Sequence, residues 1–292
     1  MDLVVQFNKS GNMSSHDAVS AVKKLFKVRK AGHAGTLDPL ATGVLLVCLN
    51  EATKITGYLS DLDKEYIVKA KLGESTDTYD TEGIIIRKSE YALAVTRSEV
   101  EKTLSGFTGA IEQTPPMFSA LKINGKPLYE LARKGIEVDR KPRVVMVRSI
   151  DIMEFKLPFL RLRVSCSKGT YIRSLCNDIG DALGVGAHVT ELARTRIGDF
   201  TLENAAEIDE LPRKTEALHT IDVALKHLPE IHVNRDEYLR ARNGNPIGLT
   251  LDIERKGGQS GSFVRMKNPE GKIFGIGKAA ANSIKIERLF KI

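Results

Sequence analysis

The sequence contains no tryptophan, and aromatic residues make up only 6% of its 292 residues. Few side chains are therefore available to stack on nucleic-acid bases. Three cysteines, Cys48, Cys166 and Cys176, form an odd set without a C-x-x-C pair. This pattern argues against a disulfide framework and against a cysteine-based zinc site, and favours reduced, partly buried thiols. The fullest apolar run, residues 44–49, is far too short to cross a bilayer.

A basic start followed by an apolar stretch is missing from the first residues, MDLVVQFNKSGNM. We therefore expect no signal peptide and a cytoplasmic protein. Hydrophobic residues at 42% and charged residues at 28% are ordinary for a globular chain. The length allows one large domain with a small one, or two domains.

The net charge of +7 is compatible with a polyanionic partner, although many proteins share such an excess. By itself it favours nucleic acid only modestly. Basic runs at residues 122–126, 133–134 and 140–143 cluster in one segment. They fit either a solvated surface or contacts with an RNA backbone.

Helical and strand periodicities divide most of the chain into short elements. Residues 14–26 carry apolar side chains at helical spacing and begin with Ser14 and Asp17, a candidate capping box. Residues 64–72 mostly alternate as a strand does. Further predicted strands cover residues 84–86, 144–152 and 160–166, and further predicted helices cover residues 98–104, with Ser98 and Glu101 as a candidate capping box, 128–133 and 172–183.

The pattern changes toward the end of the chain. Charged residues and a proline over residues 203–212 predict the start of a surface helix and a linker. Beyond residue 229, short strands alternate with glycine-rich turns, and residues 268–271 form the turn of a predicted hairpin. We therefore expect two domains, residues 1–228 and a small β-rich domain at residues 229–292.

The stretch GHAGTLDPLATGVL, residues 32–45, places Asp38 in a loop rich in glycine and proline beside an apolar run. Aspartate before proline is common in ordinary turns, which is the plainer interpretation. Gly35 and Gly43, however, allow the backbone to approach a bound object closely, and a carboxylate held there could act as nucleophile or base. His33 lies five residues away; a lone histidine is more often an ordinary surface or core residue.

Two further residues have a plain and a functional interpretation. The apolar stripe of the helix at residues 172–183 leaves Arg173 on a different face. It could be a solvated arginine, or a buried partner that keeps a carboxylate ionised. Tyr66 begins an alternating strand, where it could pack in the core or stack on a base.

Asp77, Asp80 and Glu82 lie in one polar loop and raise the question of a hard-metal site. The loop lacks a glutamate at the twelfth position of an EF-hand, so calcium is rejected. A solvated turn fits this loop better, and a metal-dependent hydrolase is disfavoured.

Four motifs in fixed order resemble the bacterial TruB family, the tRNA pseudouridine(55) synthases. They are the aspartate loop at residues 32–45, KEYIVKAKLGESTDTYDTEG at 64–83, QTPPMFSALKINGKPLYELARKG at 113–135 and SKGTYIRSLCNDIGDALGVGAHVTELARTRIGDF at 167–200. The resemblance covers about residues 2–212. The end of the chain resembles the small PUA-like domain of the family more weakly.

The resemblance implies an α+β fold, with a mixed, largely antiparallel central sheet, flanking helices and a small β-rich PUA-like domain. It implies isomerisation of uridine to pseudouridine in the T loop of tRNA, a reaction that transfers neither electrons nor a group and requires no cofactor or metal. Asp38 matches the family nucleophile, which attacks either the uracil ring or the ribose C1′. Arg173 matches the arginine that pairs with it, and Tyr66 the tyrosine that packs on the target base.

The resemblance also implies contacts with a flipped uridine. His33 matches the residue that helps to fill the vacated space, Leu192 supplies an apolar wall, Gly35 lets the loop approach the RNA, and Lys64 stands at the family's lysine position. The insertion at residues 113–143 is expected to grip the T stem-loop through phosphates and shape. We expect a monomer whose partner is tRNA, without membrane attachment.

Two other functions stay open. A guide-RNA-dependent synthase of the dyskerin type shares the aspartate motif, but it would usually lack the insertion at residues 113–143 and carry a larger PUA domain. A non-catalytic role in tRNA binding and folding could also coexist with catalysis.

Overall fold

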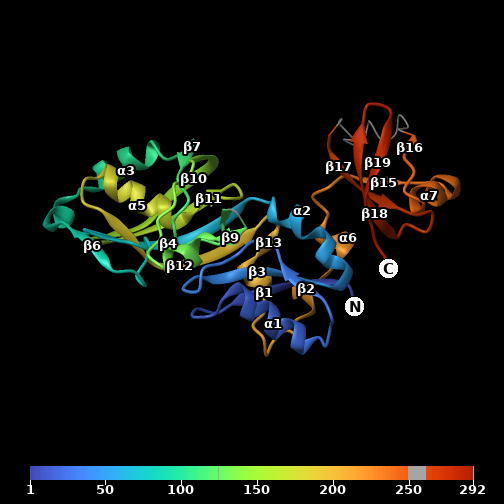
Figure 1. The fold of residues 1–292 in the computed structure, drawn as a ribbon, viewed down its shortest axis with the longest axis horizontal. Helices are drawn as coiled ribbons and strands as arrows, with labels where there is room; N and C mark the ends of the chain where they lie inside the picture. The colour runs from blue at the N-terminus through green and yellow to red at the C-terminus, as the bar shows by residue number, and fades with distance from the viewer. Residues whose placement is uncertain (124, 249–260, 292) are drawn as a thin grey trace.

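The structure, a computed structural model, describes residues 1–123, 125–248 and 261–291. It contains a large sheet with helices packed around it and a small sheet at one end of the molecule (Figure 1). The small sheet lies far from α3 and β6, which mark the opposite end (Figure 1).

The large sheet has ten strands within the described residues, in the order β14-β1-β3-β12-β4-β11-β10-β7, with β2 paired to β3 and β13 to β12. All neighbours are antiparallel except β3 and β12, which run parallel. Its strands are β1 (Leu3–Lys9), β2 (Ala31–His33), β3 (Thr42–Leu49), β4 (Lys64–Leu72), β7 (Gly109–Gln113), β10 (Arg143–Lys156), β11 (Phe159–Cys166), β12 (Ala187–Ile197), β13 (Phe200–Thr201) and β14 (Leu218–Thr220).

Short helices and two small hairpins connect these strands. The helices are α1 (Ser15–Leu25), α2 (Thr56–Ser60), α3 (Arg97–Ser105), α4 (Leu128–Ala132), α5 (Ile172–Ala182) and α6 (Ile221–Ala224), with 3₁₀ turns η1 (Asn50–Ile55), η2 (Glu90–Ala94), η3 (Leu202–Asn204) and η4 (Thr215–Ala217). The hairpins pair β5 (Glu74–Thr76) with β6 (Ile85–Lys88), and β8 (Lys122–Ile123) with β9 (Lys126–Pro127).

The small sheet has the order β15-β17-β18-β19-β16. Among the strand pairs of this sheet that the structure describes, the β15–β17 pair alone is parallel. Its elements are β15 (Glu230–His232), α7 (Arg235–Arg242), β16 (Ile247–Gly248), β17 (Phe263–Lys267), β18 (Ile273–Ala280) and β19 (Ser283–Leu289). The predicted hairpin with its turn at residues 268–271 is the β17–β18 pair. The expected fold class, a largely antiparallel mixed sheet with a small C-terminal β-sheet, is confirmed.

The cap predicted for α1 is confirmed, whereas that of α3 is wrong. Ser14 and Asp17 form a reciprocal capping box on α1. On α3 the capping box consists of Thr96 and Glu99, two residues earlier than the predicted pair. Because Glu101 falls one turn after Arg97, it forms an ion pair with that residue instead.

One other sequence expectation needs correction. Residues 203–204 end η3, Ala206 forms an isolated bridge with Phe7, and residues 208–212 form turns, so no α-helix begins in this segment. The strand predicted at residues 84–86 is found as β6, which begins at Ile85. Its isoleucines face solvent, and Ile84 and Ile86 are 74% and 65% exposed. A hairpin two strands wide has too little surface to bury both of its faces.

Apolar side chains cover both faces of the large sheet around β1 and β3. Val5 and Leu45 belong to one hydrophobic cluster, while Val4 and Leu46 belong to a second on the opposite face. This two-sided burial explains the continuous apolar run at residues 44–49, because a strand buried on both faces does not alternate. The three cysteines are free and buried, as expected.

The second cluster also contains residues of the small sheet, among them Ile276 and Phe290, both fully buried. Lys54 of η1 donates a 2.8 Å hydrogen bond to the carbonyl oxygen of Leu289. The two sheets therefore share a core. The domain boundary between residues 228 and 229 stays a prediction. Within the described residues, every helix is too short or too polar to cross a membrane.

Candidate active site

The Asp38 loop, residues 34–41, connects β2 to β3. Side chains of α1 and β1 form hydrogen bonds with its backbone. The Ser15 hydroxyl at the start of α1 accepts a 2.8 Å hydrogen bond from the Leu37 amide and donates a 3.0 Å bond to the Leu37 carbonyl. The fully buried Lys9 donates to the carbonyl oxygen of Pro39 at 3.3 Å and to that of Met13 at 2.6 Å. These contacts fix the backbone on both sides of Asp38.

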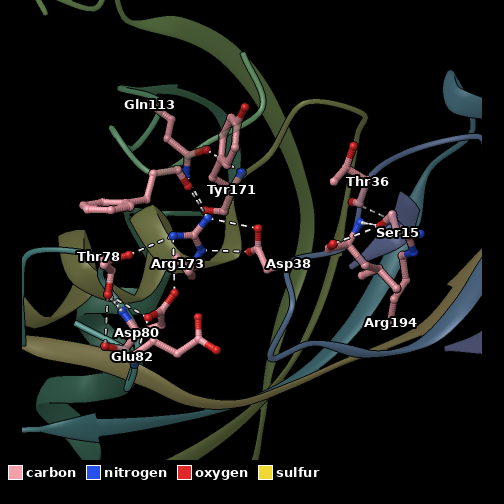
Figure 2. Close-up of polar contacts among 12 residues, drawn as sticks. Ser15, Thr36, Asp38, Thr78, Asp80, Glu82, Gln113, Tyr171, Arg173 and Arg194 are labelled. Atoms are coloured by element: carbon pink, nitrogen blue, oxygen red, sulfur yellow. Dashed lines mark hydrogen bonds and ion pairs between the residues drawn. The ribbon is translucent and has the colours of Figure 1, made fainter. Parts of the chain in front are cut away.

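The Arg173 side chain meets Asp38 in a two-point ion pair (Figure 2). Its Nε lies 2.8 Å from Oδ2, and its Nη2 lies 3.0 Å from Oδ1. Arg173 is 4% exposed and Asp38 is 31% exposed. This geometry orients the carboxylate and leaves part of it open to the cleft. The interpretation of Arg173 as a solvated helix residue is wrong.

Arg173 also binds groups on its other side, so that it is fully enclosed (Figure 2). It donates to the carbonyl oxygens of Thr78 at 2.8 Å and Phe118 at 2.7 Å. Its Nη1 lies 3.3 Å from an oxygen of Asp80, whose side chain is only 5% exposed. The solvated turn expected for this acidic loop is therefore wrong for Asp80.

Backbone anchoring explains why Arg173 points into this site. It lies in the first turn of α5, after a loop in which Gly169 has φ +82°. The Gln113 side chain accepts from the Tyr171 amide at 2.7 Å and donates to the Tyr171 carbonyl at 3.0 Å. Gln113 thereby fixes the start of α5 relative to β7.

Asp38 and Arg173 line a cleft of about 610 Å³. Tyr66 of β4, Leu192 of β12 and Gly35 of the loop line it too. Tyr66 lies opposite Val164 and Arg194 in the register of its strand. Burial raises the pKa of Tyr66, and the positive charge of Arg194 opposes part of that rise, so the Tyr66 hydroxyl is neutral at neutral pH.

Lys64 and His33 differ in their relation to this cleft. Lys64 lines it and is 5% exposed, and its ammonium group donates to the carbonyls of Ser60 and Leu62. Burial lowers the pKa of Lys64 to about 8. His33 is not among the described residues that line the cleft. Its buried Nδ1 has no hydrogen-bond partner among the described residues, and burial lowers the pKa of His33.

Sequence reasoning missed Asp80 as a partner of Arg173 and missed Lys9 and Arg194 altogether. Arg194 could have been found, because it follows Leu192 by two residues on a strand and so shares its face. Nothing local marks Asp80 or Lys9, since their roles depend on contacts between distant segments. Within the described residues, no cluster of three or more His, Cys, Asp or Glu could hold a metal ion.

The insertion at residues 113–143 contributes cleft residues and basic side chains. Ser119, Leu121 and Arg143 line the cleft. The exposed basic residues of the insertion are Lys122, Lys126, Arg133, Lys134, Lys141 and Arg143. Arg140 differs, because it is half-buried and donates a 3.0 Å hydrogen bond to the Pro115 carbonyl. Asn124, part of the turn predicted there, lies outside the described residues.

Comparison with known families identifies this arrangement. Residues 23–172 match the N-terminal domain of the TruB family pseudouridylate synthases, and residues 173–228 match the C-terminal domain of tRNA pseudouridylate synthase B. The chain belongs to the TruB family. It is therefore an enzyme that forms pseudouridine.

Curated members of the TruB family align over nearly the whole chain. A tRNA pseudouridine synthase B of Dechloromonas aromatica is 44% identical, over 95% of this chain and 91% of the relative. One of Haemophilus influenzae is 42% identical, over 99% and 95%. One of Clostridium tetani is 40% identical, over 99% of each.

Among solved structures, a chain in a Cbf5-Nop10-Gar1 complex superimposes with a TM-score of 0.75 at 26% identity, over 98% of this TruB-family chain and 84% of that one. A chain in an H/ACA RNP bound to a substrate RNA gives a TM-score of 0.74 at 24% identity, over 99% and 85%. The latter shows that the fold is shared.

Proposed function

We propose that the protein isomerises uridine to pseudouridine at position 55, in the T loop of tRNA. The observation that carries this proposal is the ion pair of Asp38 with Arg173 in a cleft that Tyr66 and Leu192 also line. Relatives with 40–44% identity that are named tRNA pseudouridine synthase B support tRNA as the substrate.

The reaction breaks the N1–C1′ bond of uridine and forms a C5–C1′ bond, while C5 loses a proton and N1 gains one. A nucleophile must hold one fragment while the base turns. Asp38 takes this role and attacks either the uracil ring or the ribose C1′. The guanidinium of Arg173 holds the carboxylate by both oxygens, which fixes its direction of attack.

Tyr66 and Leu192 bind the base in this proposal. The Tyr66 ring packs on the uracil, and Tyr66 assists removal of the proton from C5. Leu192 provides an apolar wall, Gly35 admits the RNA close to the loop, and Lys64 contacts the substrate beside Tyr66. His33 acts outside the cleft, where it helps to fill the space left by the flipped uridine.

The remaining parts hold the tRNA. The exposed basic side chains of residues 113–143 contact phosphates of the T stem-loop, which gives affinity through charge and shape. We propose residues 1–228 as the catalytic domain and residues 229–292 as a PUA-like RNA-binding domain. We further propose a cytoplasmic monomer that uses neither a cofactor nor a metal, since the isomerisation transfers no electrons.

A guide-RNA-dependent synthase is the second candidate, because a chain of a Cbf5-Nop10-Gar1 complex shares the fold. The identity to that chain is 26%, against 40–44% to the TruB relatives. The insertion at residues 113–143 also favours a stand-alone enzyme.

The test measures tritium release from tRNA labelled at uridine C5, in EDTA and without added cofactor or guide RNA. We expect one release per tRNA by the wild type and none by Asp38→Asn, with tRNA binding retained by both. A position-55 substitution in the tRNA provides the matched substrate control and should abolish release.

Full tritium release by Asp38→Asn would refute the role of Asp38 as the nucleophile. Release only after a guide RNA is added would favour the second candidate. Binding and refolding of tRNA without release by either protein would favour the non-catalytic role.

A further inference from the structure

Arg194 is a buried cation that lines the same cleft and lowers the pKa of Tyr66, but the proposed chemistry gives it no step of its own. It is 1% exposed. Its Nε donates to the Val44 carbonyl at 2.8 Å, its Nη2 to that of Gly35 at 3.1 Å and its Nη1 to that of Thr36 at 3.4 Å. Figure 2 shows it beside Thr36, apart from the Asp38–Arg173 pair.

Backbone carbonyl groups compensate the charge of Arg194. Within the described part of the chain, no aspartate or glutamate forms an ion pair with it, so carbonyl dipoles balance the charge. Two of those carbonyls, at Gly35 and Thr36, belong to the Asp38 loop. Because a guanidinium does not deprotonate in a protein, the loop is bound to a permanent charge.

Arg194 stands where the two halves of the large sheet meet. The strands β14, β1, β3 and β2 form the half that carries the Asp38 loop, while β12, β4, β11, β10 and β7 form the half that carries Tyr66 and Leu192. Among the described strands, β3 and β12 alone pair across the halves, and their register contains two residue pairs, Ala193 with Thr42 and Arg194 with Gly43. So short a ladder leaves much of the positioning to side chains.

The same junction explains Gly43 of the loop motif, whereas Gly35 requires glycine for its positive φ alone. A β-carbon on Gly43 would lie 2.2 Å from the Arg194 carbonyl oxygen, and Gly43 has φ +101°. A β-carbon on Gly35, with φ +95°, would meet the Arg194 guanidinium at 3.6 Å. The backbone approaches Arg194 more closely at Gly43 than a larger residue would allow.

We propose that Arg194 is a positioning residue: it clamps the Asp38 loop across the β3–β12 junction so that Asp38 and Tyr66 face the same base. This inference rests on the proposed function. Although Arg194 lines the cleft, all three of its guanidinium nitrogens donate to backbone carbonyls, so we assign its action to the loop. A single ammonium group could not satisfy three carbonyls with the same geometry.

The experiment compares Arg194→Met and Arg194→Lys with Arg265→Met. Arg265 is a matched control, because it is 8% exposed and donates a 3.0 Å hydrogen bond to the Leu228 carbonyl, away from the cleft. Each protein is measured for single-turnover tritium release at saturating tRNA, for tRNA Kd by filter binding, and for amide hydrogen exchange over residues 34–43.

We expect Arg194→Met to slow release by about 100-fold or more, the scale of a small misplacement of a reacting group, while the tRNA Kd changes by less than about threefold. Amides of residues 34–43 should exchange faster, whereas those of β4 stay protected. Arg194→Lys, which retains the charge, should fold and show a smaller change in the same direction. Arg265→Met should match the wild type in loop exchange. Because Arg265 lies in the proposed RNA-binding domain, its rate of release is compared only at saturating tRNA, where a change in the tRNA Kd has no effect.

The inference fails if folded Arg194→Lys and Arg194→Met both release tritium at the wild-type rate, or if loop exchange is unchanged. It fails equally if Arg265→Met slows release as much, since the effect would then be general destabilisation. Should Arg194→Met not fold, the Arg194→Lys data decide alone. Absence of release by the wild type would instead refute the proposed function, while hydrogen exchange would still test the clamp.

Discussion

Buried charge is distributed very differently in the two sheets. Around the cleft of the large sheet, Lys9, Lys64, Arg173 and Arg194 are each at most 5% exposed. In the small sheet, among the described residues, Arg265 is the one buried charged side chain. The cleft cations bind mainly backbone carbonyls and buried carboxylates, an arrangement that costs several kcal/mol per ion unless every partner is in place.

The environment of Arg265 makes its charge less costly to bury than the charges around the cleft. It pairs with Asp222 at 2.6 Å and Glu230 at 3.3 Å, which are 30% and 41% exposed, and Lys267 joins both carboxylates. Water therefore shares in solvating this cluster. The difference shows that the large sheet tolerates an electrostatic cost near Asp38 that the small sheet avoids. Function, rather than stability, accounts for the position of the cleft charges.

The largest effect that this comparison predicts is that of Arg173→Met. The variant leaves Asp80 buried without its cation, which should lower the free energy of unfolding by roughly 3–5 kcal/mol. The rate of tritium release should fall by about 10³-fold or more, because Asp38 loses both of its orienting bonds. Urea denaturation and single-turnover assays measure the two effects. A variant as stable as the wild type would show that the cleft charges carry no such cost.

Asp80→Asn should have the next largest effect, and Asp77→Asn is its control. Asp80 lies 3.3 Å from Arg173, so loss of its charge should cost about 1–3 kcal/mol and slow release less than Arg173→Met does. Asp77 is exposed, and its Oδ1 accepts from the Ile84 amide at 2.8 Å, a bond that asparagine retains. Asp77→Asn should stay within about 0.5 kcal/mol of the wild type. Equal effects of the two variants would contradict the burial argument.

Lys64→Met should show that the free-energy cost of burying the Lys64 charge depends on pH. Burial lowers the Lys64 pKa from its ordinary 10.5 to about 8. Below pH 8 Lys64 is protonated in both the folded and the unfolded protein, so its contribution to the free energy of unfolding is constant. Between pH 8 and 10.5 Lys64 is protonated more fully in the unfolded protein than in the folded one, so the free energy of unfolding rises with pH. Relative to Lys64→Met, the wild type should gain up to about 1.4 kcal/mol per pH unit in that range. Denaturation at pH 7, 8 and 9 measures this, and a difference that does not vary with pH would contradict it.

Arg265→Met should have the smallest effect on function. It removes a partly hydrated cluster and one bond to the Leu228 carbonyl, so we expect a loss of about 1–3 kcal/mol in the free energy of unfolding. Urea denaturation measures that loss. If it exceeded the loss in Arg173→Met, the contrast between the two sheets would be reversed.

The sequence predicted what local patterns encode. Alternation gave β4 and β11 with their buried faces, and helical spacing gave α1 with its cap. Asp38 stood out because its loop is unusual within a few residues. Arg173 could not be assigned a partner by spacing, since the chain brings it to Asp38 only through the sheet. Asp80 was read as solvated for the same reason: its burial depends on Arg173, far away in sequence.

The shared cluster beneath β3 has a consequence for how the chain is made. Val4 and Phe290 pack in one core, although nearly all of the 292 residues separate them. During synthesis from the N-terminus, part of that face of the first strands stays uncovered until Ile276 and Phe290 have left the ribosome. The enzyme therefore cannot complete its core piece by piece, and the nascent chain must keep an apolar sheet face from aggregating until then.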